Sequence, residues 1–303
     1  MTSKLLESFG GKFAEQWVTT LLTPAFAFWS GGVIAAIQRW GWQSLTRQFS
    51  QYPEPLLIAI LVCCFGAIAL SAFIIQRFDL AVLRFLEGYW CPWLRVLRHR
   101  LIQREKSRLR KIEKNLKPLV DKGILNLNTD EQAEYVKLDW QQMYMPSTPD
   151  QLMPTRLGNI LRATERRPSE RYGLDAVICW PRLWLLLPDT ARKDLQEARA
   201  DLSNAARVWF WSLLFSIWTL LGAWWAFPIG LITACFAYYG WILDAATTYA
   251  DLINAAFDVH RILLYQALRW KLPSTAAEEI ATGQQLTEYL WNGSDSAQLS
   301  FLD

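Results

Sequence analysis

Uncharged stretches divide this chain into blocks, and the longest runs from Val208 to Leu243 without one formally charged side chain. A single straight helix of that length would span roughly 54 Å, whereas the hydrocarbon core of a bilayer is about 30 Å thick. Proline and glycine within Ala226–Gly230 mark the place where the chain would reverse direction. The pattern therefore predicts a transmembrane helical hairpin at residues 208–246, with its turn near Pro228.

Two further apolar stretches predict a first hairpin within residues 1–76. Residues 17–37 are uncharged, and residues 56–75 are apolar or small. Each meets the length of about 20 residues that a membrane-crossing helix needs. The AFA sequence at 25–27 resembles a signal-peptidase site, so a cleaved signal peptide is the alternative interpretation of the first stretch. The predicted fold class is all-α, an integral membrane protein with four transmembrane helices in two hairpins and a helical cytosolic domain.

The region between the hairpins, residues 77–207, begins with a strong excess of positive charge. Residues 77–117 hold twelve basic and four acidic side chains, a net charge of +8. Basic residues next to a membrane span stay in the cytoplasm, which predicts that both termini and the C-terminal helical extension, residues 247–303, are cytoplasmic. This topology predicts a multi-pass protein of the plasma (inner) membrane. Thr275 to Glu278 resembles a capping box and predicts a short helix within that extension.

Apolar residues recur in the basic segment at helical spacing, which predicts an amphipathic helix. Its charged face is either simply solvated or bound to anionic lipid headgroups, an attraction of about 1 kcal/mol per basic residue. No nucleic acid is expected as a partner, because a positive patch beside a membrane does not require one. The basic side chains expected to face lipid are Arg95, Arg98, Arg100 and Arg104. The aromatic side chains expected at the membrane interface are Trp90, Trp93, Trp180 and Trp184.

Three aspartates spaced by seven residues are the strongest candidates for function: Asp244, Asp251 and Asp258, with Asn254 near the same helix face. Seven residues turn a helix by about 700°, so the aspartates form one stripe. One interpretation pairs this stripe with Arg77 and Arg84, which are also seven residues apart. Another places the stripe around the axis of a homo-oligomer, where rings of carboxylates would concentrate cations. A solvated stripe is the third.

The chain lacks the sequence motifs of several common classes of enzyme. There is no phosphate-binding GxxxxGK[ST], no GxSxG, no HExxH and no GxGxxG, so neither an enzyme nor a cofactor is expected. Two histidines and five cysteines without a CxxC pair predict neither a metal site nor a disulfide framework.

Three segments carry a resemblance to a set of uncharacterised bacterial multi-pass membrane proteins. They are LMPTRLGNILRATE at 152–165, RYGLDAVICWPRLWLLLP at 171–188, and AAFDVHRILLYQALRWKLP at 255–273. The resemblance implies a bacterial origin and a shared architecture. It implies no reaction and no functional residue.

The functional expectation is a homo-oligomeric membrane protein that forms or gates a pore, with a preference for cations. The alternative is a non-conducting scaffold or sensor, or a subunit of a larger membrane complex, that binds a protein partner or anionic lipid through its cytosolic helices. The two differ in ion flux, which the alternative excludes.

Overall fold

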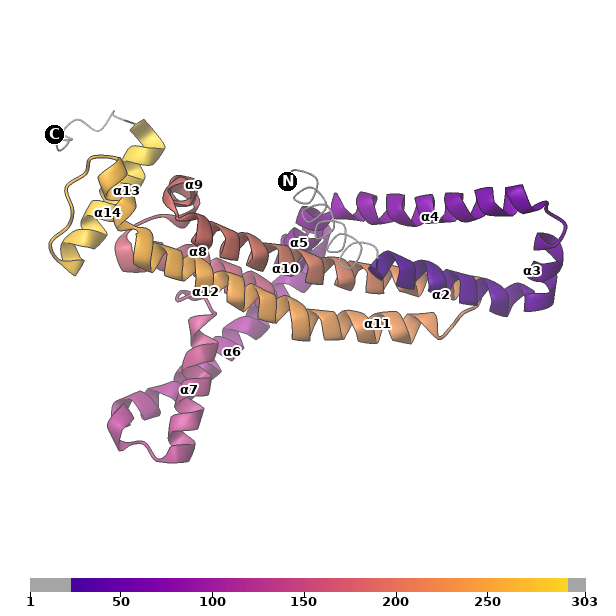
Figure 1. Cartoon of the computed structure of the whole chain (residues 1–303). Helices are drawn as coiled ribbons and strands as arrows, with labels where there is room; N and C mark the ends of the chain where they lie inside the picture. The colour runs from indigo at the N-terminus through magenta and orange to yellow at the C-terminus, as the bar shows by residue number, and fades with distance from the viewer. Residues whose placement is uncertain (1–22, 294–303) are drawn as a thin grey trace. The chain divides into compact units, whose positions relative to one another are not determined.

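The computed structural model describes residues 23–293, which form helices joined by short turns and contain no strand (Figure 1). The all-α prediction is confirmed for this part of the chain. The described residues form two compact units, the first made of residues 23–83 and 201–242 and the second of residues 84–200 and 243–293. The beginning of the predicted span 17–37 lies outside the described residues.

The first unit contains two helical hairpins. Its elements are α2 (Thr23–Trp40), α3 (Trp42–Phe49), α4 (Glu54–Gln76), the first turn of α5 (Asp79–Glu87), the C-terminal part of α10 (Asp189–Phe215), the 3₁₀ helix η5 (Ser216–Leu221), α11 (Ala226–Phe236) and the π-helix η6 (Ala237–Ile242).

In the first hairpin, α2 and α4 are joined through the short helix α3 (Figure 1). Pro55 lies in the first turn of α4, where its missing N–H has no partner to lose. The indole of Trp29 donates to Ser71 Oγ at 3.1 Å, and Phe26 contacts Phe65 with ring centroids 5.9 Å apart. Residues on one side of α4 thus pack against α2.

The second hairpin reverses at Gly222–Trp225, just before the predicted turn at 226–230. Gly222 has φ 91°, a left-handed conformation that favours glycine, and it ends η5. Pro228 lies in the first turn of α11 instead, because a proline there breaks no intrahelical hydrogen bond. Where α11 packs on α10, a Cβ on Gly230 would collide with the Ser212 carbonyl, so glycine permits the close approach.

By length and composition, two of the described helices can cross a membrane. They are Glu54–Gln76, with mean hydropathy 2.8, and the continuous helix Ala226–His260, with mean hydropathy 1.6. The helix α2 ends in polar residues, and α10 is charged over its N-terminal half. Neither helix therefore has the combination of length and hydropathy that marks the other two as able to cross a membrane. The four-span arrangement therefore stays a prediction.

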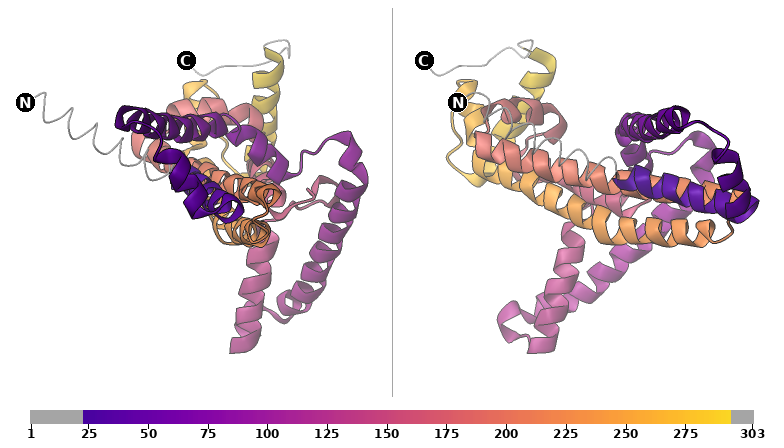
Figure 2. Two further views of the ribbon diagram at one scale, coloured as in Figure 1. Left: turned by 90° about the vertical axis from the view of Figure 1, so that its right-hand side faces the viewer. Right: turned by 45° about the vertical axis from the view of Figure 1, so that its right-hand side comes forward.

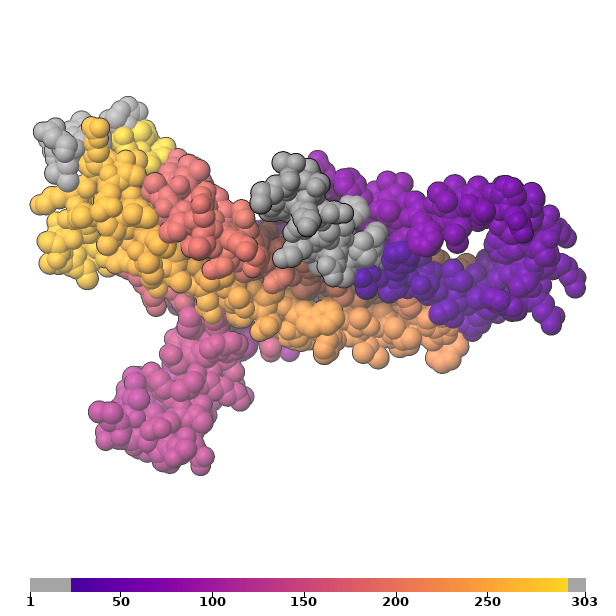
Figure 3. Space-filling model, viewed as in Figure 1, coloured from indigo at the N-terminus to yellow at the C-terminus, as the bar shows by residue number. Residues whose placement is uncertain are grey.

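The second unit contains the other helices. They are the rest of α5, η2 (Pro92–Leu94), α6 (Arg95–Lys122), η3 (Ile124–Asn126), α7 (Thr129–Met143), η4 (Pro149–Gln151), α8 (Arg156–Tyr172), α9 (Ala176–Leu186), the N-terminal part of α10, α12 (Leu243–His260), α13 (Ile262–Ala267) and α14 (Ala276–Asn292). The helices α6 and α7 lie side by side as a hairpin (Figure 2), and α13 and α14 form one continuous mass with α9 (Figure 3).

Two apolar cores hold the second unit together. One lies between α6 and α7 and includes Leu109, Ile112 and Leu138. The other lies among α8, α9, α12, α13 and α14 and includes Leu183 and Phe257. The apolar helix α9 therefore belongs to a core, with Leu183 fully buried.

Side-chain caps set several helix starts in the second unit. Asn128 forms a capping box with Glu131 at the start of α7. Thr275 accepts a hydrogen bond from the Glu278 N–H at the start of α14, as predicted. The described bounds of α14 therefore agree with the expected short C-terminal helix.

Candidate functional site

The N-terminal half of α6 presents a basic surface that no core covers. The first buried residue of α6 is Glu105, and the others follow at helical spacing: Leu109, Ile112, Leu116 and Leu119. Before Glu105, the four predicted lipid-facing side chains are exposed: Arg95, Arg98, Arg100 and Arg104. Three apolar side chains are exposed in the same segment, Trp93 at 80%, Val96 at 66% and Leu97 at 46%. We call these seven residues the α6 basic-apolar surface.

The four predicted interface tryptophans differ in their surroundings. Trp93 is exposed, whereas Trp90 is half-buried and donates from its indole to the Phe85 carbonyl at 2.7 Å. Trp180 and Trp184 pack on the core of the second unit, with the Trp180 ring centroid 5.8 Å from that of Phe257. Of the four, Trp93 therefore has the exposure that contact with lipid requires.

Two members of the aspartate stripe are engaged within the second unit. Asp251 accepts a hydrogen bond from the Tyr144 hydroxyl at 2.6 Å. Asp258 accepts one from the Tyr172 hydroxyl at 2.7 Å and lies 3.7 Å from Arg171. Because α12 packs along α8, these contacts tie the stripe to its own unit.

The other two members of the stripe have different environments. The Asp244 side chain is exposed, and its backbone carbonyl accepts hydrogen bonds from Thr247 and Thr248. Asn254 is buried, and within the described chain its Oδ1 atom accepts no hydrogen bond. Asp244 is thus the member most accessible to an external cation or partner.

The predicted arginine partners Arg77 and Arg84 are both exposed. Arg77 and Asp244 belong to different units, so their pairing stays a prediction. Arg84 and Asp251 belong to the same unit, where Asp251 is bonded to Tyr144 and forms no ion pair among the described residues. The seven-residue spacing alone did not reveal these tyrosine partners.

An ion pair that the sequence interpretation missed joins α5 to α10 in the first unit. Arg207 Nε donates to Asp79 Oδ1 at 2.8 Å, and Arg207 Nη2 donates to Asp79 Oδ2 at 2.8 Å. Arg207 Nη1 donates to Asn204 Oδ1 at 2.9 Å. The side chains are only 11% and 19% exposed. Such a two-pronged, partly buried contact is the strong form of an arginine–carboxylate pair. The sequence signal was present, because each residue lies just outside a predicted span.

Burial and charge shift the acidity of several groups in the second unit. Burial and the nearby Asp251 raise the pKa of the Tyr144 hydroxyl, and burial and Asp258 raise the pKa of Tyr172. Burial also raises the pKa of the Glu87 carboxyl, an effect that Arg199 opposes. The two tyrosines therefore remain hydrogen-bond donors over a wide pH range.

A second cluster of charged and aromatic groups fixes the C-terminal helix to α12 and α8. Arg261 Nε contacts Glu279 Oε1 at 2.6 Å, and the guanidinium carbon lies 4.1 Å from the centre of the Tyr172 ring. In the described chain, no group of three or more His, Cys, Asp or Glu side chains could hold a metal ion. The contacts of Arg261 attach α14 to the helices beside it.

The five cysteines are free thiols with contrasting exposure. Cys179 is buried in the core of the second unit, and burial raises the pKa of its thiol to about 11. The other four are exposed: Cys63, Cys64, Cys91 and Cys235.

No family model, no curated protein and no solved structure matches this chain.

Proposed function

We propose that this chain is a multi-pass scaffold of the bacterial plasma membrane that holds its second unit at the inner leaflet by binding anionic lipid. The observation that carries the proposal is the α6 basic-apolar surface, defined above. It combines four exposed arginines with exposed Trp93, Val96 and Leu97. Anionic headgroups attract the charges, and the interfacial zone accepts the apolar side chains.

The position of this surface in the chain also supports the proposal. The helix Glu54–Gln76 can cross a membrane, and α6 begins at Arg95, a short distance further along the chain. Basic residues close to a span stay in the cytoplasm, where the leaflet carries anionic lipid. In this proposal the chain crosses four times, in the two hairpins, with both termini inside.

The experiment measures lipid binding to the purified full chain in detergent by native mass spectrometry. Phosphatidylglycerol and phosphatidylcholine are titrated separately. The test variant replaces Arg95, Arg98, Arg100 and Arg104 with Gln. The control variant replaces Arg110, Lys111, Lys114 and Lys117, which are equally exposed on the C-terminal half of α6, with Gln.

The proposal expects the wild-type chain to prefer phosphatidylglycerol, and the test variant to lose about tenfold or more of that affinity, at roughly 1 kcal/mol per charge. The control variant should lose much less, because its charges lie beside the core between α6 and α7 rather than beside exposed apolar residues. Equal losses in the two variants would refute a specific lipid-binding surface.

A homo-oligomeric, cation-preferring pore is the second candidate, and one observation favours it. The Asp244 carboxylate is exposed, and no described residue forms an ion pair with it. Asp251 and Asp258 give the pore less support, because they are bonded to tyrosines of their own unit. Reconstituted protein should then conduct cations, and Asp244→Asn should reduce the selectivity. A non-conducting wild type would end this candidate.

A further inference from the structure

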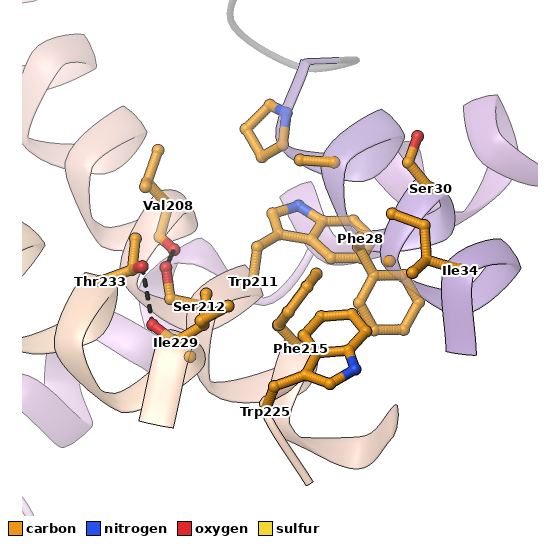
Figure 4. Close-up of a pocket in the computed structure, with 14 residues that line it drawn as sticks. Phe28, Ser30, Ile34, Val208, Trp211, Ser212, Phe215, Trp225, Ile229 and Thr233 are labelled. Atoms are coloured by element: carbon orange, nitrogen blue, oxygen red, sulfur yellow. Dashed lines mark hydrogen bonds between the residues drawn. The ribbon is translucent and has the colours of Figure 1, made fainter. Parts of the chain in front are cut away.

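A cavity of about 380 Å³ lies within the first unit, between α2, the C-terminal turns of α10, and α11 (Figure 4). This volume falls within the range of about 300–1,000 Å³ that is typical of small-molecule sites. Four aromatic side chains form much of its wall: Phe28, Trp211, Phe215 and Trp225.

The hydroxyl groups on the wall offer little to a polar ligand. Ser212 donates to the Val208 carbonyl at 2.7 Å, and Thr233 donates to the Ile229 carbonyl at 2.8 Å, as Figure 4 shows. These two hydroxyl protons are therefore used within their own helices, and exposed Ser30 supplies the third hydroxyl group of the wall. The other lining residues are mostly apolar or small, so the cavity is suited to a hydrocarbon occupant.

One indole on the wall has no hydrogen-bond partner among the described residues. Trp218 donates from its indole to the Phe28 carbonyl at 2.9 Å, and Trp225 donates to Gln38 Oε1 at 2.8 Å. The Trp211 indole N–H donates to no residue in the described chain. Its side chain is only 5% exposed, and its nitrogen is not among the fully buried polar atoms that lack a partner. A donor that has left water without gaining an acceptor is unfavourable, so an acceptor supplied by a ligand would be favourable.

The depth of Trp211 indicates which acceptor this would be. Trp211 follows Arg207 by one helical turn, about 6 Å along α10, and Arg207 forms the ion pair with Asp79. Charged pairs are expensive in hydrocarbon, so the ion pair marks the polar edge of the bilayer. Trp211 then lies just inside that edge, where the ester groups of phospholipids are found.

Part of the cavity wall is made of exposed apolar side chains. Two of its lining residues, Ile34 at 55% and Ile229 at 48%, are strongly exposed. Exposed isoleucines on membrane helices contact lipid tails. The hydrocarbon next to these side chains is therefore the tail of a phospholipid.

We infer that the cavity binds one acyl chain of a membrane phospholipid and that the Trp211 N–H donates to the ester carbonyl oxygen of the same lipid. The inference rests on the proposed function in one respect, because it requires the first unit to lie in the bilayer. It does not require α6 to bind anionic lipid.

The experiment uses the full chain in vesicles of dioleoylphosphatidylcholine doped with a phosphatidylcholine that carries a photoactivatable diazirine on one acyl chain. This headgroup has no net charge, so binding by α6 is not measured. After illumination, cross-linked peptides are mapped and their yields are compared. The highest yield is expected in peptides of α2, the end of α10, and α11.

The test variant Ala27→Phe adds a ring at an exposed residue that lines the cavity, and the control Ala67→Phe adds the same ring to an exposed residue of α4 outside it. Cross-linking of the cavity peptides should fall several-fold in the first variant and stay unchanged in the second. Trp211→Phe should lower it by roughly two- to tenfold, the effect of one hydrogen bond. Its control is Trp224→Phe, at an exposed residue of the turn.

The outcomes separate the two ideas. If α4 is labelled and the cavity peptides are labelled no more than α4, regardless of Ala27→Phe, then the acyl-chain site is refuted while the first unit is still in lipid. If α4 itself is not labelled, the first unit is not in the bilayer, and the proposed function fails with the inference.

Discussion

Arg207 holds Asp79 in a two-pronged ion pair, with 2.8 Å contacts from its Nε and Nη2 atoms to the two carboxylate oxygens. The two residues are far apart in the sequence, and the pair joins the chain after α4 to the helix that enters the second hairpin. Both side chains are largely buried. The pair is thus a cross-link between the two hairpins of the first unit.

Removing one partner of this pair should destabilise the first unit strongly. Arg207→Ala or Asp79→Ala leaves the other charge buried and unpaired, which costs about 3–5 kcal/mol. We expect a melting temperature several degrees lower in detergent, measured by fluorescence-detected size exclusion after heating. Arg77→Ala is the control, because Arg77 is exposed. An equal loss in the control would contradict the special role of the pair.

Glu87→Gln should stabilise the second unit at neutral pH. Burial raises the pKa of the Glu87 carboxyl in the folded chain, so the ionised form disfavours folding. A group with a raised folded pKa contributes stability below its unfolded pKa and loses it as pH rises. The variant should therefore melt higher than wild type at pH 7, and this advantage should vanish below the ordinary glutamate pKa of 4.5.

The control for this pH profile is Glu113→Gln, at an exposed position of α6. It should leave the melting temperature nearly unchanged at both pH values. A Glu87→Gln variant that melts lower than wild type at pH 7 would show that the attraction of Arg199 outweighs the burial of the carboxylate.

The crossing of α8 and α14 should tolerate no side chain at Gly283. A Cβ there would collide with the Tyr172 carbonyl, and a Cβ on Gly173 would collide with the Ile280 carbonyl. Since the obstacles are backbone atoms, Gly283→Ala should cost about 1–3 kcal/mol. Thermal melting measures the loss. Gly66→Ala in α4 is the matched control, because no atom lies within 4 Å of its added Cβ. If Gly66→Ala were as costly, the explanation through backbone overlap would be wrong.

Asn159→Leu should destabilise the junction of α6 and α8. Asn159 is 1% exposed, accepts from the Met153 N–H at 2.7 Å and donates to Glu105 at 3.3 Å. The substitution leaves two buried polar groups without this partner, at about 1–3 kcal/mol for each unsatisfied group. Chemical denaturation of the purified chain would measure the loss. Asn115→Leu, exposed on the same helix α6, should be near neutral.

Local sequence signals were sufficient for much of the fold. The apolar run at 56–75 coincides with α4, because a continuous apolar stretch of that length has few alternatives to a helix. The cap at Thr275 was found from side-chain chemistry within four residues. The turn of the second hairpin was misplaced by a few residues, since Pro228 is compatible with the first turn of a helix and Gly222 carries the reversal.

Contacts between distant segments were not predictable from the same signals. Helical spacing places Asp251 and Asp258 on one face, but it does not reveal which helix covers that face. Tyr172 ends α8, which packs along α12, and Tyr144 directly follows α7, so both tyrosines are partners that are remote in sequence. Likewise, the cavity of the first unit depends on how three helices pack, which no single amphipathic pattern specifies.

Because the cysteines differ in exposure, thiol labelling can determine on which side of the membrane Cys91 lies. Cys63, Cys64 and Cys235 lie on helices that can cross a membrane, where a water-soluble reagent does not reach them, and Cys179 is buried in a core. Cys91 is exposed two residues before Trp93. A water-soluble maleimide added to intact spheroplasts or to inverted vesicles would therefore react at Cys91 from one side only, without any engineered tag.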